Sequence, residues 1–295
     1  MLNNRCTLCP RQCGVAREST LGRGHCGMTT TARVARAALH FGEEPCISGT
    51  QGSGTVFFSG CPLHCRFCQN HTISQDGWGK DVSPARLADI FRELEQQGAH
   101  NINLVSATQF IPTVREALAH YRPAIPIVYN SGGYERVETL RTLEGLVDIY
   151  LPDYKYADNA LGAALSGVTD YSDRATEAIA EMARQTGPMQ LDSCGIAVRG
   201  TMVRHLVLPG HTKNSLAVLE RLAAILPRGV FVSLLFQYTP VRDIDGFPSL
   251  SRRLTKRERE KVFNHLLALG LTDGYTQETE SASAAYIPSF DLTGV

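Results

Sequence analysis

Three cysteines stand close together after a short apolar segment, in the spacing C-x3-C-x2-C at Cys61, Cys65 and Cys68. A closed zinc or iron–sulfur site takes four ligands, so three thiolates leave one metal position open for chemistry. The alternatives are a zinc site completed by His64 or His71, and buried thiols that bind nothing. Zinc sites usually pair two C-x2-C-like knuckles, and this spacing is not such a pair. The motif therefore favours an iron–sulfur cluster held by three cysteines.

A second set of cysteines, Cys6, Cys9, Cys13 and Cys26, lies nearer the start of the chain. Four thiolates close a metal site. An auxiliary iron–sulfur cluster and a structural zinc ion both suit them, and zinc would staple a segment too small to have a core of its own. The neighbouring three-cysteine motif favours the iron–sulfur alternative.

Charge and composition narrow the class of protein. The 295 residues are 43% hydrophobic, which is ample for a core, and Lys+Arg equals Asp+Glu at 29 each. No basic bias indicates a nucleic-acid partner. The first residues contain no apolar stretch typical of a signal peptide, and no apolar run is long enough to cross a membrane. We therefore expect a cytoplasmic protein, and in a reducing cytosol the nine cysteines favour metal binding over disulfides.

Downstream of residue 54, apolar and β-branched segments alternate with amphipathic ones. We expect strands at 55–60, 102–105, 125–129, 147–151, 203–208 and 230–236, and helices at 84–98, 112–121, 135–143, 173–185, 215–226 and 255–269. Strands separated by helices of this length form right-handed βαβ units and a parallel sheet. Periodicity alone leaves both a barrel and a doubly wound sheet open.

The cysteine motif, with the aromatic Phe67 before its last cysteine, resembles the signature of the radical S-adenosylmethionine (SAM) superfamily. Most of the chain is similar to the pyruvate formate-lyase activating enzyme-like group, through the segments 9–13, 43–45, 57–61, 68–70, 129–135, 148–155 and 203–210. The resemblance implies an α/β fold, a partial (β/α)6 barrel of the TIM type over residues 51–270. Residues 1–50 would form a Cys-rich metal-binding extension, and residues 271–295 an irregular tail.

The same resemblance implies the chemistry. Cys61, Cys65 and Cys68 would hold a [4Fe–4S] cluster whose open iron binds SAM. After reduction by a flavodoxin or ferredoxin, SAM would be cleaved to a 5′-deoxyadenosyl radical that abstracts hydrogen. In activating enzymes the target is a glycine of a partner glycyl radical enzyme. The alternatives are modification of a peptide or small molecule, and a non-catalytic iron–sulfur electron-transfer or scaffold protein.

Polar residues at the expected strand ends are candidates for binding SAM, because active sites of α/β barrels form where the βα loops converge. By resemblance, Asn130, Ser131, Asp153 and Lys155 would lie near its methionyl part or near a monovalent cation. The alternative for Asp153 and Lys155 is an exposed loop pair. Arg204, on the fifth expected strand, is a further candidate.

One segment departs from the superfamily pattern. A Gly-Gly-Glu-like turn commonly follows the second strand and meets the SAM amino group, but here the strand ends in Ser106-Ala107-Thr108-Gln109. We expect Thr108 and Gln109 to supply the hydrogen-bond acceptors instead. His40, Glu43 and Glu44 are expected to form a solvated turn, the default for charged residues.

Overall fold

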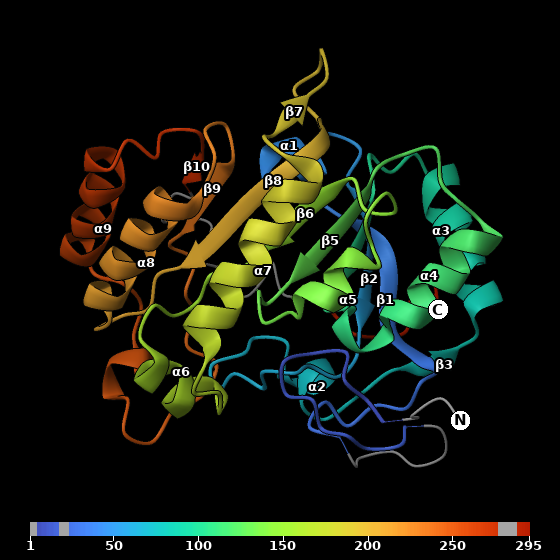
Figure 1. Cartoon of the computed structure of the whole chain (residues 1–295), viewed down its shortest axis with the longest axis horizontal. Helices are drawn as coiled ribbons and strands as arrows, with labels where there is room; N and C mark the ends of the chain where they lie inside the picture. Colours follow the sequence, from blue (N-terminus) through green and yellow to red (C-terminus); the bar gives the residue numbers. More distant parts are fainter. Residues whose placement is uncertain (1–4, 18–23, 277–287) are drawn as a thin grey trace.

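The computed structural model describes residues 5–17, 24–276 and 288–295, and shows a curved, mostly parallel sheet with helices on its outer face (Figure 1). In these residues the strands are β1 (Ala32–His40), β2 (Ser53–Phe58), β3 (Lys80–Val82), β4 (Ile102–Val105), β5 (Ile127–Ser131), β6 (Ile149–Pro152), β7 (Gln190–Leu191), β8 (Ala197–Leu206), β9 (Phe231–Leu235) and β10 (Gly274–Thr276). All six expected strands are present, as β2, β4, β5, β6, β8 and β9.

The sheet runs in the order β10-β9-β8-β6-β5-β4-β2-β1-β3, and β7 pairs with β8. All pairs from β2 to β10 along this path are parallel, whereas β1 is antiparallel to both β2 and β3. The two ends of the path do not pair with each other, so the sheet curves without closing. This confirms the expected partial barrel.

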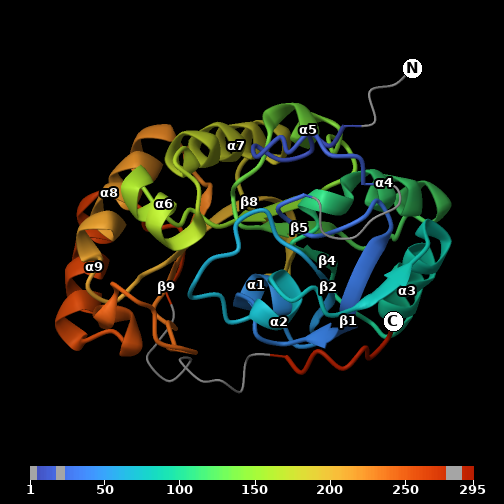
Figure 2. The ribbon, with the colours of Figure 1, turned by 90° about the horizontal axis from the view of Figure 1, so that it is seen from below.

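The helices are α1 (Pro45–Ser48), α2 (His71–Ser74), α3 (Pro84–Gln96), α4 (Ile111–His120), α5 (Val137–Arg141), α6 (Asn159–Ser166), α7 (Tyr171–Thr186), α8 (Thr212–Ile225) and α9 (Lys256–Ala268). Seen from below, α3 to α5 and α7 to α9 surround the sheet, and α1 lies inside its curve (Figure 2). None of the described helices is both long and apolar enough to span a membrane.

Local sequence explains where the helices begin. The Ser83 hydroxyl accepts a hydrogen bond from the Arg86 amide, and Pro84 occupies the first helical position of α3. At α9, Thr255 and Glu258 form a complete capping box. Helices cover the outer face of the parallel strands, and all six residues of β2 are buried.

Four of the described strands, β1, β3, β7 and β10, were not expected from the sequence, and two of them, β1 and β10, extend the six expected strands at either end. β1 carries Arg33, Arg36 and His40 among its alanines and valine, which hides its pattern, yet it pairs with β2 over most of its length. β10 is short and lies in a segment expected to be irregular, and parallel pairing with β9 holds it in the sheet. Both strands depend on a neighbouring strand that the local sequence does not show.

The segment 41–52, which contains α1, folds back between the antiparallel strands β1 and β2 and enters the curve of the sheet. The expectation of a solvated turn here was wrong for its acidic residues: Glu44 is only 4% exposed, and the Glu43 side chain is 11% exposed. Asn101 donates a hydrogen bond to the Ile47 carbonyl at 2.8 Å and so holds α1 against the strands. Tertiary packing therefore places two carboxyl groups inside the barrel.

Candidate functional site

The three-cysteine motif follows β2 directly, as a loop at the carboxyl end of the parallel strands. Each sulfur accepts a hydrogen bond: Cys61 from the Leu63 amide at 3.4 Å, Cys65 from the Ser166 hydroxyl at 3.0 Å, and Cys68 from the Ser74 hydroxyl at 3.4 Å. Hydrogen bonds to sulfur stabilise the thiolate form that binds metals. Three soft, hydrogen-bonded sulfurs on one short loop fit an iron–sulfur cluster.

Burial makes these thiols unfavourable as free thiolates. It raises the pKa of Cys61 to about 12 and also raises the pKa of Cys68, with the neighbouring Cys65 adding to both shifts. Lys155 acts in the opposite direction on Cys68. A buried thiolate needs a compensating positive charge, and a bound metal centre supplies it.

Gln109 lies beside the entrance to the cysteine loop. Its side-chain amide donates to the carbonyls of Ser59, Gly60 and Ser106 at 2.8, 3.1 and 2.8 Å. Gln109 thereby holds the residues that precede Cys61. The expectation that it offers acceptors for SAM remains a prediction, and its Oε1 atom is buried without a hydrogen-bond partner.

Thr108 donates to the buried carboxyl of Glu135 at 2.7 Å. Burial raises the pKa of Glu135 to about 7, against the opposing effect of the Thr108 hydrogen bond. Sequence reasoning did not select Glu135, although it ends the segment 129–135 that carries part of the resemblance. Its position shortly after Gly132 and Gly133, beyond the end of β5, is the sequence feature that could have marked it as a site residue.

Arg204 is the centre of an ion-pair network on the inner face of the sheet. Its guanidinium donates to Asp153 at 3.1 Å, to Glu43 at 2.9 Å and to the side-chain oxygen Oδ1 of Asn130 at 2.5 Å. Lys155 pairs with the other oxygen of Asp153 at 2.5 Å. The structure thus brings together four of the seven predicted SAM-binding residues, and shows that Asp153 and Lys155 are not an exposed loop pair.

The charges in this network hold one another ionised. Burial alone would raise the pKa of Asp153, but Lys155 and Arg204 lower it below its ordinary value. Burial alone would lower the pKa of Lys155, but Asp153 raises it above its ordinary value. Ser131 stands beside the network, where its hydroxyl accepts from the Gly133 amide at 3.3 Å.

The four cysteines of the N-terminal set meet around one small pocket of about 20 Å³. Its lining includes Cys6, Cys9, Cys13 and Cys26 together with Arg17, His25, Pro62, Thr108 and Gln109. The Gln12 amide donates to the Cys9 carbonyl and the Gly14 amide to the Cys6 carbonyl, both at 3.0 Å, which folds the loop so that the cysteines converge. Arg17 lies 3.8 Å from the Cys6 sulfur, and burial raises the pKa of Cys9 to about 12. The four thiols therefore line one common pocket.

The two cysteine centres adjoin. Arg11, between Cys9 and Cys13, donates to the Pro62 carbonyl at 2.5 Å and to the Ser166 carbonyl at 3.0 Å. The rings of His25 and His64 stand 4.5 Å apart. Among the described residues, no three His, Cys, Asp or Glu side chains form a ready-made site for a single metal ion. Both centres are therefore inferred from the spacing of the cysteines and from the hydrogen bonds that their sulfurs accept.

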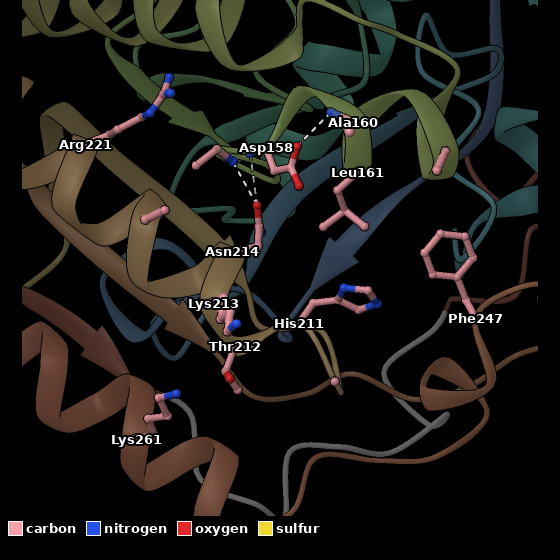
Figure 3. A pocket seen from close by; sticks show the side chains of 14 residues that line it. Asp158, Ala160, Leu161, His211, Thr212, Lys213, Asn214, Arg221, Phe247 and Lys261 are labelled. Carbon is pink, nitrogen blue, oxygen red and sulfur yellow. Dashed lines mark hydrogen bonds between the residues drawn. The ribbon is translucent and has the colours of Figure 1, made fainter.

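A larger cavity of about 660 Å³ lies beside α6 (Figure 3). Lys213 and Arg221 of α8 and Lys261 of α9 line it, together with His211 and Phe247. Its acidic lining residue, Asp158, accepts a hydrogen bond from the Ala160 amide at 2.8 Å and so caps α6. At the end of α6, Ser166 donates to the Cys65 sulfur, so this helix connects the cavity wall to the cysteine loop.

Comparisons with known proteins agree with this geometry. The sequence model of the radical SAM superfamily matches residues 55–223. An uncharacterized protein of Methanocaldococcus jannaschii, MJ0674, is 31% identical over 267 residues, which cover 87% of this chain and 72% of that protein.

The fold is similar to that of one solved structure in particular. A radical SAM methyltransferase from Sphaerobacter thermophilus aligns with a TM-score of 0.51 at 15% identity, over 76% of this chain and 66% of that one. A domain of a pyruvate-formate lyase-activating enzyme from Bacteroides vulgatus aligns at 0.39 and 16% identity, over 66% of this chain and 91% of that one. With the family model matching more than half of its length and the three cysteines at the end of β2, this chain belongs to the radical SAM superfamily.

Proposed function

We propose that the protein is a radical SAM enzyme in which Cys61, Cys65 and Cys68 hold a [4Fe–4S] cluster. The observation that carries the proposal is the set of three loop sulfurs, each with its own hydrogen-bond donor, beside the ion-pair network of Arg204. When bound, the cluster and SAM would supply a carbon radical that abstracts hydrogen from a substrate. The test is formation of 5′-deoxyadenosine from SAM by anaerobically reconstituted protein reduced with dithionite.

The residues of the chain position the reactants. Gln109 and the Ser166 and Ser74 hydroxyls hold the loop and its thiolates, and the network through Asp153 and Lys155 offers both signs of charge to an amino acid moiety such as that of SAM. Asn130, Ser131, Thr108 and Arg204 complete the proposed SAM-binding set. The curved sheet with its cover of helices limits access of water to this region.

For the substrate, we propose a glycine Cα–H bond of a partner glycyl radical enzyme. The similarity of the segments 129–135, 148–155 and 203–210 to activating enzymes supports this. The alternative is a peptide or small molecule. A glycyl radical signal in a candidate partner, formed only with the reduced protein and SAM, would distinguish the two.

We propose that Cys6, Cys9, Cys13 and Cys26 hold an auxiliary iron–sulfur cluster, because the two centres share the wall formed by Pro62 and Gln109. Replacing Cys9 and Cys13 together by serine is expected to remove about half of the bound iron and acid-labile sulfide. Metal and sulfide analysis of the reconstituted proteins measures this. Stoichiometric zinc in the unmodified protein, with iron unchanged in the variant, would show a zinc site instead.

We propose that an acidic flavodoxin or ferredoxin docks over the cavity lined by Lys213, Arg221 and Lys261. Charge reversal of Lys213 and Lys261 to glutamate should slow reduction by such a donor about tenfold at low salt, since complementary charge speeds association. The difference in reduction rate between the variant and the unmodified protein should shrink as salt screens the charges. Turnover with dithionite should stay unchanged, and Lys256→Glu, on α9 but outside the cavity lining, is the matched control. Equal slowing with dithionite would contradict docking at this surface.

A further inference from the structure

Residues 288–295 lie along the outer edge of β1, far from β10 in the strand order (red in Figure 2). β3 pairs with this edge only from Ala32 to Val34. Beyond that point, the Leu292 amide donates to the Ala35 carbonyl at 3.1 Å, and the Ala37 amide donates to the Thr293 carbonyl at 2.8 Å. The segment therefore occupies main-chain groups that an exposed strand edge offers to any extended polypeptide.

Side chains add specificity to these main-chain contacts. The Arg36 guanidinium reaches Asp291 at 2.8 Å and the Ser289 carbonyl at 3.1 Å. The Trp78 indole donates to the Phe290 carbonyl at 2.9 Å. The ion pair with Asp291 favours an acidic residue at this position, whereas the two carbonyl contacts hold the main chain whatever its sequence. Leu292 and Gly294 have positive φ, so the segment ends in a turn.

The ring of Phe290 is the apolar anchor. It packs edge-on against Phe57 at 5.6 Å and joins the buried group of Ala35, Phe57 and Ile73. Phe57 belongs to β2, the strand that leads directly into Cys61. A polypeptide anchored here lies along β1 and contacts, through its aromatic ring, the strand that leads to the cysteine loop.

The surface continues beyond the segment. A pocket of about 230 Å³ borders Pro288 and is lined by Leu39, His40, Phe41 and Phe57 among others. Phe41 is 59% exposed, which is unusual for so large an apolar side chain. A polypeptide longer than the segment 288–295 would find a partly apolar pocket for one more side chain.

We propose that the β1 edge is a binding site for a polypeptide that carries an aromatic–acidic pair, and that residues 288–295 are its built-in occupant. An external polypeptide competes with this tethered segment, whose effective concentration is high because it belongs to the same chain. Binding requires neither metal nor SAM, so this inference goes beyond the proposed function and does not depend on it.

The test uses a fluorescein-labelled peptide with the sequence of residues 288–295 and measures its binding by anisotropy. The full chain with Phe290→Ala and Asp291→Asn should bind the peptide at least tenfold more tightly than the unmodified chain, because its own segment competes poorly. A peptide with alanine in place of its phenylalanine should lose at least tenfold in affinity. No binding to the folded double variant, or equal binding to both chains, would overturn the proposal.

Matched variants of β1 locate the site. Arg36→Gln in the double-variant background should abolish peptide binding, whereas Arg33→Gln should not, since Arg33 pairs with Asp81 instead. If loss of Phe290 prevents folding, Asp291→Asn alone serves, because this side chain is half exposed and its replacement leaves the core filled. That single variant should still bind the peptide several-fold more tightly than the unmodified chain, and unchanged affinity would contradict the proposal.

Discussion

Replacing Cys65 by alanine is expected to lower 5′-deoxyadenosine formation from SAM by more than about 100-fold in anaerobically reconstituted, dithionite-reduced protein. Loss of a residue that only orients a metal ligand typically costs 10–100-fold, so loss of the ligand itself should cost more. Cys65 is buried, and its sulfur accepts the 3.0 Å hydrogen bond from Ser166. Chromatography measures the 5′-deoxyadenosine, and iron and sulfide analysis measures the bound clusters. Together they distinguish a variant that has lost only the reaction from one that has lost both metal centres.

Two further variants sharpen this experiment. Ser166→Ala removes the donor to the sulfur but keeps the ligand, and should lower product about tenfold or shift the reduction potential of the cluster. Cys194→Ala removes an exposed cysteine outside both sets and should behave like the unmodified protein. Iron-loaded protein that forms no product, with or without Cys65, would contradict the catalytic proposal and favour an electron-transfer or scaffold role.

Replacing Arg204 by methionine is expected to lower the free energy of unfolding by about 3–5 kcal/mol, because it leaves the largely buried Glu43 without its ion-pair partner and Asp153 with Lys155 alone. The side chains of Arg204 and Glu43 are only 14% and 11% exposed. Urea denaturation followed by circular dichroism at neutral pH measures the loss. Arg174→Met is the matched control: it removes an ion pair whose arginine is 44% exposed, and should change stability by less than about 1 kcal/mol.

The pH dependence of stability follows from the direction in which the pKa of Asp153 is shifted. Its pKa is lower in the folded protein than the ordinary 3.8, so its contribution to stability is present above that value and is lost as pH falls through the folded pKa. The difference between Arg204→Met and the unmodified protein should therefore narrow in acid. A small difference in stability between the two proteins at neutral pH would show that Arg204 does not compensate the charges of Asp153 and Glu43.

Much of the fold could be predicted from the sequence because its signals are local. The Ser83 cap with Pro84 marks the start of α3, and the apolar runs mark the six parallel strands of the barrel. β1 and β10 could not be predicted, since each is held by pairing with a strand that is not evident from its own residues. Glu135 was missed for a related reason: its raised pKa comes from burial, which a local pattern does not show.

The sequence by itself determined the cysteine spacings, the alternation of strands and helices, and with them the superfamily, because thiolate ligands and secondary-structure periodicity depend on residues a few positions apart. Only the tertiary structure decided which charges meet. Arg204 and Glu43 are 161 residues apart in the chain, yet they pair inside the curve of the sheet. The same holds for the adjoining cysteine centres and for residues 288–295 on the β1 edge. Burial and ion pairing between distant segments depend on how the whole chain packs, and no local pattern of residues encodes that packing.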